Sequence, residues 1–329
     1  MENFKTAGLI RPEYNRAQAW GHLYLAMRQA SGRLQVSGLT PLVPAQELRE
    51  PLGLRRAAAL AILSFGLAAI SAAAELKQDT IHAFERYMKV TEDDRDDRLR
   101  RSAPFLWIDR QPEARRQTLY EKLKRGDIVV ERQETRDDNR RIRVPHGIVH
   151  DYLSVVFIPG ATLSQTIALM QNYLSYPELF KFGVERSQVL RHEGDHYEFQ
   201  LRMFRKGNSS VFYNVDLSDQ YLSLGATRGY RRSRSTRIAE LSDVGKPSEH
   251  ELAIGKDRGL LWRMNTDWSC EEKDGGVYLQ VELIALSRDV PAIFAWLANP
   301  YIRSIPREYL QQVLQSMRSG LVAKPPAPK

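Results

Sequence analysis

Apolar and polar residues alternate along most of the chain between residues 184 and 287, with the two-residue period typical of β-strands. Turn residues such as Gly194-Asp195 and Gly207-Asn208 interrupt this pattern at short intervals, which favours antiparallel hairpins over crossover connections. The strands are predicted at 149–158, 184–191, 197–205, 211–217, 221–227, 230–241, 260–270 and 277–287. The sequence therefore predicts a large antiparallel sheet.

Two segments have the three-to-four-residue apolar period of a helix. In the first, Thr162 and Gln165 form a capping-box pattern that begins a helix, and Tyr176-Pro177 ends it. Its apolar stripe is Leu163, Ile167, Met170 and Leu174.

The second helical segment, 304–321, is expected to organise the fold. Ser304 can cap it and Pro306 suits its first turn, while Gly320 stops it. A separate short helix is predicted just before it, at 291–298. The apolar face of the long helix is Ile305, Leu310, Val313, Leu314 and Met317. Because this stripe needs a cover and the strands are the cover available, we expect an α+β fold in which a curved antiparallel sheet wraps around the C-terminal helix, followed by a disordered tail at 323–329.

Eighteen residues without a charge, 57–74, follow Arg55-Arg56. A basic start, an apolar centre and the small residues Ala72 to Ala74 are the order of a secretory signal, so we predict cleavage near Ala74 and an exported, periplasmic protein. Residues 1–54 then form a doubtful segment upstream of the true translation start. An uncleaved membrane anchor and a buried alanine-rich helix are the alternatives for 55–74.

Residues 75–145 are charged and mainly helical in pattern, with Ile81, Phe84 and Met88 on one face. A short hairpin is predicted at the end of this segment. We expect these residues to form an N-terminal extension that packs on the sheet of a domain at 146–322.

Charge and cysteine content narrow the possible partners. The chain has 329 residues, 43% of them hydrophobic, and a formal net charge of +8. Residues 1–74 hold eight Lys and Arg against four Asp and Glu, so the remainder carries 40 against 36, or +4, and a nucleic-acid partner is not expected. Cys270 is the single cysteine, which excludes an intrachain disulfide and a multi-cysteine metal site.

Strand alternation also predicts which side chains face the C-terminal helix. Asp267 and Glu282 fall on the opposite, outward face. The residues expected to line the space between sheet and helix are Phe199, Leu201, Tyr213, Trp262, Met264, Trp268, Val281, Leu283, Leu314 and Met317. Two tryptophans, a tyrosine and a methionine give this space the width of an apolar pocket, and a solid core is the alternative.

Other candidate groups receive structural interpretations. His146 and His150 have no carboxylate or third ligand at metal spacing, so no metal site is predicted. Cys270 is predicted to be a small buried hydrophobe. A basic run is predicted to be solvated and paired locally with Glu240 or Asp243, with an anionic headgroup or membrane surface as the alternative partner. The run consists of Arg228, Arg231, Arg232, Arg234 and Arg237.

Two stretches resemble the START-like (SRPBCC, helix-grip) superfamily. They are Val155-Val156-Phe157-Ile158-Pro159-Gly160 and Asn172-Tyr173-Leu174-Ser175-Tyr176-Pro177-Glu178-Leu179-Phe180. With the hairpins and the long last helix, they are similar to the polyketide-cyclase and coenzyme-Q-binding branches and to uncharacterised exported bacterial members, over about residues 147–322. The resemblance implies a hydrophobic cavity in which members hold lipids, sterols, quinones or polyketides, and only some of them catalyse a reaction.

These observations favour an exported binding protein, without a cofactor, that encloses a lipid, isoprenoid or polyketide-like ligand. An enzyme of the cyclase or hydrolase type in the same cavity is the first alternative, and it needs an inward titratable group that the alternation does not provide. A structural or interaction module with a filled core and no ligand is the second.

Overall fold

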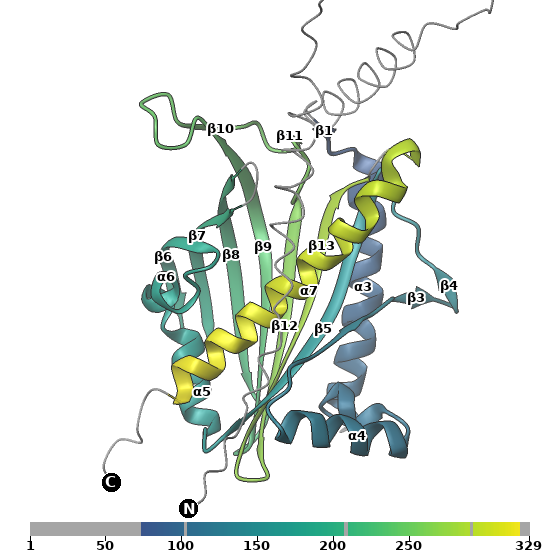
Figure 1. The fold of residues 1–329 in the computed structure, drawn as a ribbon, viewed down its shortest axis with the longest axis vertical. Helices are drawn as coiled ribbons and strands as arrows, with labels where there is room; N and C mark the ends of the chain where they lie inside the picture. Colours follow the sequence, from purple (N-terminus) through teal and green to yellow (C-terminus); the bar gives the residue numbers. More distant parts are fainter. Residues whose placement is uncertain (1–73, 102–103, 207–209, 290–291, 323–329) are drawn as a thin grey trace, which may run out of the picture. The chain divides into compact units, whose positions relative to one another are not determined.

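The computed structural model describes residues 74–101, 104–206, 210–289 and 292–322, without the side chains of 292–303 (Figure 1). The predicted signal and the segment upstream of it lie outside the described residues, apart from Ala74, and so does the predicted tail at 323–329. The strand β1 (Ala74–Glu75) pairs antiparallel with β11 (Lys256–Asp257). No helix among the described residues is long and apolar enough to cross a membrane.

One nine-stranded antiparallel sheet dominates the structure, with the strand order β2-β5-β13-β12-β9-β8-β7-β6 and with β10 paired to β9. The strands are β2 (Val129–Arg132), β5 (Gly147–Pro159), β6 (Val184–Glu193), β7 (His196–Arg205), β8 (Val211–Ser223), β9 (Arg228–Ser242), β10 (His250–Glu251), β12 (Arg263–Lys273) and β13 (Gly276–Arg288). A two-residue pair, β3 (Arg136–Asp137) and β4 (Arg140–Arg141), stands apart from it. The large antiparallel sheet predicted from the alternation is thus present.

The predicted break after residue 217 is wrong, because β8 continues to Ser223. Gly225, with a φ of +103°, lies in the tight connection between β8 and β9. The polar residues at 218–220 are accommodated within the strand because their backbone pairs with both β7 and β9.

Helices cover both faces of the sheet. They are α3 (Gln78–Arg100), η1 (Trp107–Arg110), α4 (Glu113–Lys124), α5 (Leu163–Gln171), η2 (Tyr173–Ser175), α6 (Tyr176–Leu179) and α7 (Ala292–Val322). The predicted capping box of α5 is formed, since Thr162 Oγ1 accepts from the Gln165 backbone and Gln165 in turn accepts from the Thr162 backbone. Figure 1 shows α7 crossing the sheet diagonally.

The division of the C-terminal segment into two helices is wrong, because α7 is one helix of 31 residues that runs through Pro306. A proline inside a helix removes one backbone hydrogen bond and costs about 3 kcal/mol or more. Pro306 itself is buried, and α7 packs against β5, β13 and β2. We attribute the uninterrupted helix to this packing, which outweighs the local signals at Ser304 and Pro306.

Each face of the sheet has its own apolar cluster. The face packed on α7, here called the grip face, includes Val281 and Leu283 of β13 together with Leu314. The other face, here called the back face, packs Ile284 of β13 against Phe84 of α3. Because both faces are covered, β13 is apolar at odd and even positions alike.

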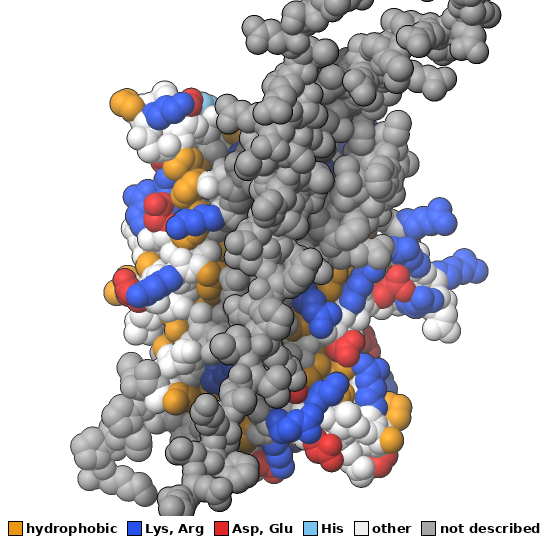
Figure 2. Space-filling model, viewed as in Figure 1, with side chains coloured by type: hydrophobic (Ala, Val, Ile, Leu, Met, Phe, Trp, Pro, Cys, Tyr) orange, Lys and Arg blue, Asp and Glu red, His pale blue; other side chains and the backbone are white. Residues whose placement is uncertain are grey.

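The N-terminal extension is part of the same sheet. Its strand β2 pairs with β5 at the edge, and α4 packs with Leu153 and Phe157 on the back face. On the surface seen in Figure 2, Lys and Arg side chains lie among Asp and Glu. Exposed ion pairs of the described residues include Lys89 with Asp93.

Candidate ligand-binding site

Nine of the ten residues predicted to line the space between the sheet and the C-terminal helix lie in one buried cluster between the grip face and α7. They are Phe199, Leu201, Tyr213, Met264, Trp268, Val281, Leu283, Leu314 and Met317. Each is at most 8% exposed, because strand alternation brings the seven strand residues to one face and Leu314 and Met317 of α7 pack against that face. Their predicted face is confirmed, and their contact with a ligand stays a prediction.

Trp262 is the exception, and its predicted position is wrong. It packs on the back face with Phe84 and Tyr87 of α3, and its indole Nε1 donates to Asp257 Oδ1 at 3.1 Å. Residue 262 lies in a bend before β12 begins at Arg263, so the alternation that governs Met264 and Trp268 does not extend to it. The aromatic wall of the grip face therefore contains one strand tryptophan, Trp268.

Side chains fill the space between the sheet and the described part of α7. Phe199, Val215 and Leu314 are fully buried there. Two hollows that the described residues form lie elsewhere, one as an open groove beside Gln311 and Gln315 of α7 and one under α3. The enclosed apolar cavity that the resemblance implies stays a prediction, since the side chains of 292–303 of α7 lie outside the described residues.

A charged pair is buried within the apolar cluster of the grip face. Arg231 of β9 is 6% exposed and Asp219 of β8 is fully buried, and their ion pair has an Arg231 Nη2 to Asp219 Oδ2 distance of 2.5 Å. The Tyr173 hydroxyl donates to the same Asp219 oxygen at 2.6 Å, and Arg231 Nη1 donates to the Tyr176 hydroxyl at 3.2 Å. Tyr221 joins through its hydroxyl, 3.1 Å from that of Tyr173.

Aromatic rings surround the guanidinium. Its central carbon lies 5.7 Å from the centroid of Trp268 and 5.8 Å from those of Tyr173 and Tyr221. Burial alone would lower the pKa of Arg231, but the Asp219 carboxylate and the tyrosines raise it well above its usual value, so the cation persists in the interior. Burial also raises the pKa of Tyr176 and of Tyr309 on α7 to about 12, so both phenols stay neutral.

This charged pair has unused hydrogen-bonding capacity. Arg231 Nε and Asp219 Oδ1 are buried and have no hydrogen-bond partner among the described residues. A buried polar atom without a partner costs free energy, whereas a polar ligand group or a water would satisfy both a donor and an acceptor here. The arrangement can therefore recognise one polar group at the end of an apolar molecule.

The sequence did not reveal this pair because a β-bulge reverses the alternation of β9. Asp216 pairs with Arg237 and Leu217 with Ser235, so Thr236 is an extra residue in β9. Ile238 and Arg231, an odd number of residues apart, consequently share the grip face. The register supplies the signal that the sequence lacks, since Arg231 lies directly opposite Trp268.

The predicted pairing of the basic run with Glu240 or Asp243 is also wrong. The observed ion pairs are Arg228 with Glu271, Arg231 with Asp219, Arg232 with Asp96, Arg234 with Glu92 and Arg237 with Glu251. Side chains on neighbouring strands lie opposite one another, whereas residues many positions apart on one strand are too distant to pair. Glu240 instead pairs with Arg258, and Asp243 with Lys246.

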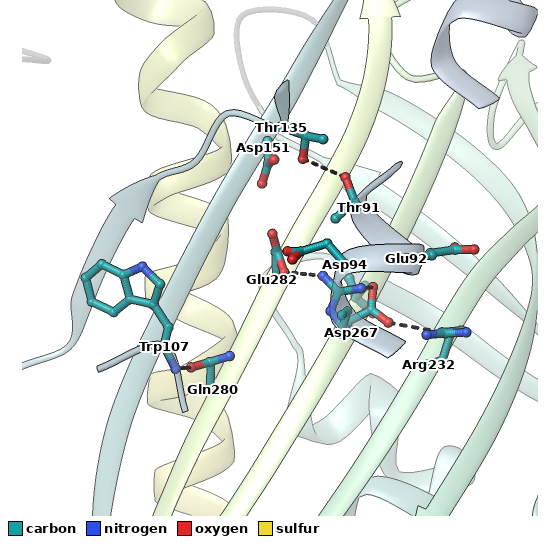
Figure 3. Close-up of polar contacts among 12 residues, drawn as sticks. Thr91, Glu92, Asp94, Trp107, Thr135, Asp151, Arg232, Asp267, Gln280 and Glu282 are labelled. Carbon is teal, nitrogen blue, oxygen red and sulfur yellow. Dashed lines mark hydrogen bonds and ion pairs between the residues drawn. The ribbon is translucent and has the colours of Figure 1, made fainter. Parts of the chain in front are cut away.

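Asp267 and Glu282 face away from α7, as predicted, but they are not solvated. The two carboxylates come from neighbouring strands (Figure 3). Arg95 of α3 pairs with both of them, at 2.6 Å between Arg95 Nη1 and Asp267 Oδ2. Arg234 Nη2 is a further partner of Asp267 at 3.0 Å. The charged helix α3 therefore supplies the cover that the strand pattern alone could not predict.

The remaining candidates do not form a reactive site. No group of three His, Cys, Asp or Glu residues in the described part of the chain could hold a metal ion. Cys270 is buried, as predicted, and burial raises its pKa to about 12, so it is a poor nucleophile. His150 Nε2 lies 2.8 Å from Ser287 Oγ on the grip face.

No family model matches the chain, and no curated protein matches it. Similar solved structures include a STAR-related lipid transfer protein from Xanthomonas axonopodis (15% identity, TM-score 0.38, 58% of this chain and 98% of that one). A START superfamily protein from Mycobacterium smegmatis (12%, 0.33, 54% and 97%) and an aromatase/cyclase from Streptomyces sp. R1128 (10%, 0.31, 53% and 92%) are others. The neighbours are START-like proteins, as the sequence resemblance predicted, and the α+β helix-grip architecture is the one described above. At these TM-scores the likeness carries no argument about ligand or reaction, so function is argued from the residues.

Proposed function

We propose that the protein binds an elongated apolar molecule with one polar end. The observation that carries this proposal is the buried pair Arg231 and Asp219, which keeps a free donor and a free acceptor inside an aromatic and aliphatic interior. The apolar body of the ligand would lie along the grip face against Trp268 and Met264. A carbonyl or carboxylate at its end would accept a hydrogen bond from Arg231 Nε, and a hydroxyl could accept from Arg231 Nε or donate to Asp219 Oδ1.

Binding next to residues 304–322 of α7 requires these residues or their neighbours to move, because side chains fill the space between them and the sheet. The apolar face of α7 contributes Leu310, Leu314 and Met317 to that space. A ligand of lipid size would therefore have to displace part of α7 or exchange places with these side chains.

The geometry supports binding more strongly than acid–base catalysis. Asp219 and Glu240 are inward carboxylates of the kind that the enzyme alternative requires, but Asp219 is paired with Arg231 and Tyr173, and Glu240 with Arg258. Burial raises the pKa of Tyr173 strongly, and that of Tyr176 to about 12, so neither phenol is matched to proton transfer near neutral pH. Hydrogen-bond recognition needs no such titration.

Tryptophan emission tests the position of the apolar body. Titration of the delipidated full chain with a long-chain fatty alcohol should change its emission saturably. Trp268→Phe should remove most of the change, whereas Trp262→Phe, which alters the back face, should preserve it. Probes that bind none of these proteins while circular dichroism shows an intact fold would favour the ligand-free module.

A double variant tests the polar end. Arg231→Leu combined with Asp219→Asn removes the ion pair without leaving one buried charge alone. The variant should bind the fatty alcohol roughly tenfold or more weakly, the equivalent of one lost hydrogen bond to a charged group. A hydrocarbon of equal length should bind the variant and the native protein alike. Equal affinity of both proteins for the alcohol would contradict the role of this pair.

Export is a further part of the proposal and rests on the order of basic, apolar and small residues at 55–74. The intact mass of protein recovered from the native host should correspond to a chain that begins at or near Glu75. A mass that retains residues 1–54 would contradict it.

A further inference from the structure

A small polar pocket lies under the N-terminal extension, on the back face and away from the proposed apolar site. It has a volume of about 30 Å³ and lies between the end of α3, η1 and the strands β12 and β13. Its polar lining includes Arg95, Arg98, Arg110, Ser269, Gln280 and Glu282. Three guanidinium groups and the Glu282 carboxylate thus line it, and two further carboxylates, Asp267 and Asp94, pair with Arg95 and Arg98.

The arginines of this pocket are unequally compensated. Arg95 is paired with Glu282 and Asp267 and is buried. Arg98 pairs only with Asp94, whose side chain is 66% exposed. Arg110 has no ion-pair or hydrogen-bond partner among the described residues. The charge that no carboxylate of the described residues pairs with therefore resides on Arg110, and Arg98 is paired only with an exposed carboxylate.

Neutral donors point to the same space. The Gln280 side-chain oxygen accepts from the Trp107 backbone at 2.8 Å, which fixes the amide with its Nε2 turned away from Trp107 (Figure 3). Neither that nitrogen nor the Ser269 hydroxyl has a hydrogen-bond partner among the described side chains. The pocket thus contains guanidinium, amide and hydroxyl donors, and few of the described side chains accept hydrogen bonds from them.

Arg98 is partly buried and Arg110 is exposed, and the two cations repel each other. Burial lowers the pKa of Arg98 to about 10, with the Arg110 charge as the next cause. Desolvation also lowers the pKa of Arg110, although Glu282 raises it, and Arg95 adds a smaller lowering. A bound anion would relieve both effects.

We propose that this pocket binds a phosphate group. Planar guanidinium groups bond oxyanions in a bidentate manner, and Ser and Gln supply the neutral donors that a tetrahedral anion uses. One water needs roughly 10–15 Å³ of such space, so the pocket admits part of a phosphate and leaves its remaining oxygens at the opening. The phosphate can be free or the headgroup of a phospholipid, and the pocket chemistry is the same for both.

Calorimetric titration of the full chain with inorganic phosphate tests the proposal. One saturable site is expected, and Arg110→Gln and Arg98→Gln should each weaken it about tenfold or more. Arg101→Gln is the matched control, because Arg101 is three residues beyond Arg98 with its side chain 80% exposed, and it should leave the affinity unchanged. Circular dichroism checks that each variant is folded.

A second arm distinguishes the source of the phosphate. Sedimentation with vesicles of phosphatidylcholine, with and without phosphatidic acid, measures binding of the lipid headgroup. Binding in either arm that depends on Arg110 supports the proposal. Absence of binding in both arms would overturn it, and so would an equal loss of affinity in Arg101→Gln, which would indicate nonspecific charge attraction.

Discussion

The arginines on the two faces of strand β9 differ in the number of carboxylates with which they pair. On the back face, Arg232 and Arg234 share Asp267 with Arg95, and α3 supplies further carboxylates, so most charges have several partners. On the grip face, Arg231 has the single carboxylate Asp219, and Arg231 Nε and Asp219 Oδ1 have no hydrogen-bond partner among the described residues. On the back face Arg95 Nη1 and Arg232 Nε also lack a hydrogen bond, but both lie at ion-pair distance from Asp267. The comparison indicates that the back-face network holds the extension to the sheet, whereas the grip-face pair is arranged for a group that comes from outside.

The largest effect is expected at the centre of the back-face network. Asp267→Ala leaves Arg95 without one carboxylate and removes a partner of Arg234, and breaking a buried pair in this way costs about 3–5 kcal/mol. Chemical denaturation should report a loss of unfolding free energy of that size. Asp93→Ala, at an exposed ion pair of the same helix, is the control and should behave as the native protein. A similar result for both variants would mean that the network does not stabilise the fold.

Packing of α7 on the grip face is expected to contribute nearly as much to the free energy of unfolding as the back-face network. Leu314 is fully buried in that cluster, and Leu314→Ala should lower the unfolding free energy by about 2–5 kcal/mol. Leu174→Ala is the matched control because Leu174 is 74% exposed, and its effect should be within about 0.5 kcal/mol. A shift near zero for Leu314→Ala would contradict the helix-grip arrangement.

Acid should affect the two faces in different pH ranges. Burial lowers the pKa of His150 on the grip face from 6.5 to about 4, so between these values the unfolded chain binds a proton that the folded protein does not. Stability should therefore fall as pH falls through this range, by at most roughly 3 kcal/mol. Denaturation curves recorded from pH 7 to 4 should show a smaller loss for His150→Gln. An identical pH dependence would show that folding does not lower the pKa of His150.

The pKa of Asp267 is lowered, in spite of its burial, by Arg95 and Arg234. The ionised Asp267 therefore stabilises the folded protein at pH values above 3.8, its pKa in the unfolded chain. This stabilisation is lost only as the pH falls below 3.8. The grip face should thus respond to acid before this carboxylate does.

Much of the fold could be predicted because periodicity reports burial. Alternation located the sheet and placed seven of the eight predicted strand residues on the grip face correctly, and the helical period gave the apolar face of α7 from Leu310, Leu314 and Met317. The continuation of α7 through Pro306 could not be predicted, since tertiary packing overrides a local helix signal. Trp262 was placed on the wrong face because β12 begins at Arg263, one residue after Trp262, and not at 260 as predicted.

The polar part of the candidate site was beyond the sequence for a different reason. Arg231 and Asp219 come from neighbouring strands, and their meeting depends on the register and on the extra residue Thr236. The phosphate pocket likewise combines Arg98 and Arg110 of the extension with Gln280 of β13, more than 150 residues later in the chain. Long-range pairings of this kind leave no local pattern.

The bulge at Thr236 determines which side chains of β9 before it point to the grip face and which to the back face. Deleting this one residue while keeping the pairing on its C-terminal side would rotate every earlier position of β9 to the other face, taking Arg231 toward α3 and bringing Arg232 into the apolar interior. An insertion of one residue would do the same, whereas a change of two would restore the original order. In relatives of this chain, strand length at this point should therefore be a better guide to the chemistry of the interior than the number of arginines in the strand.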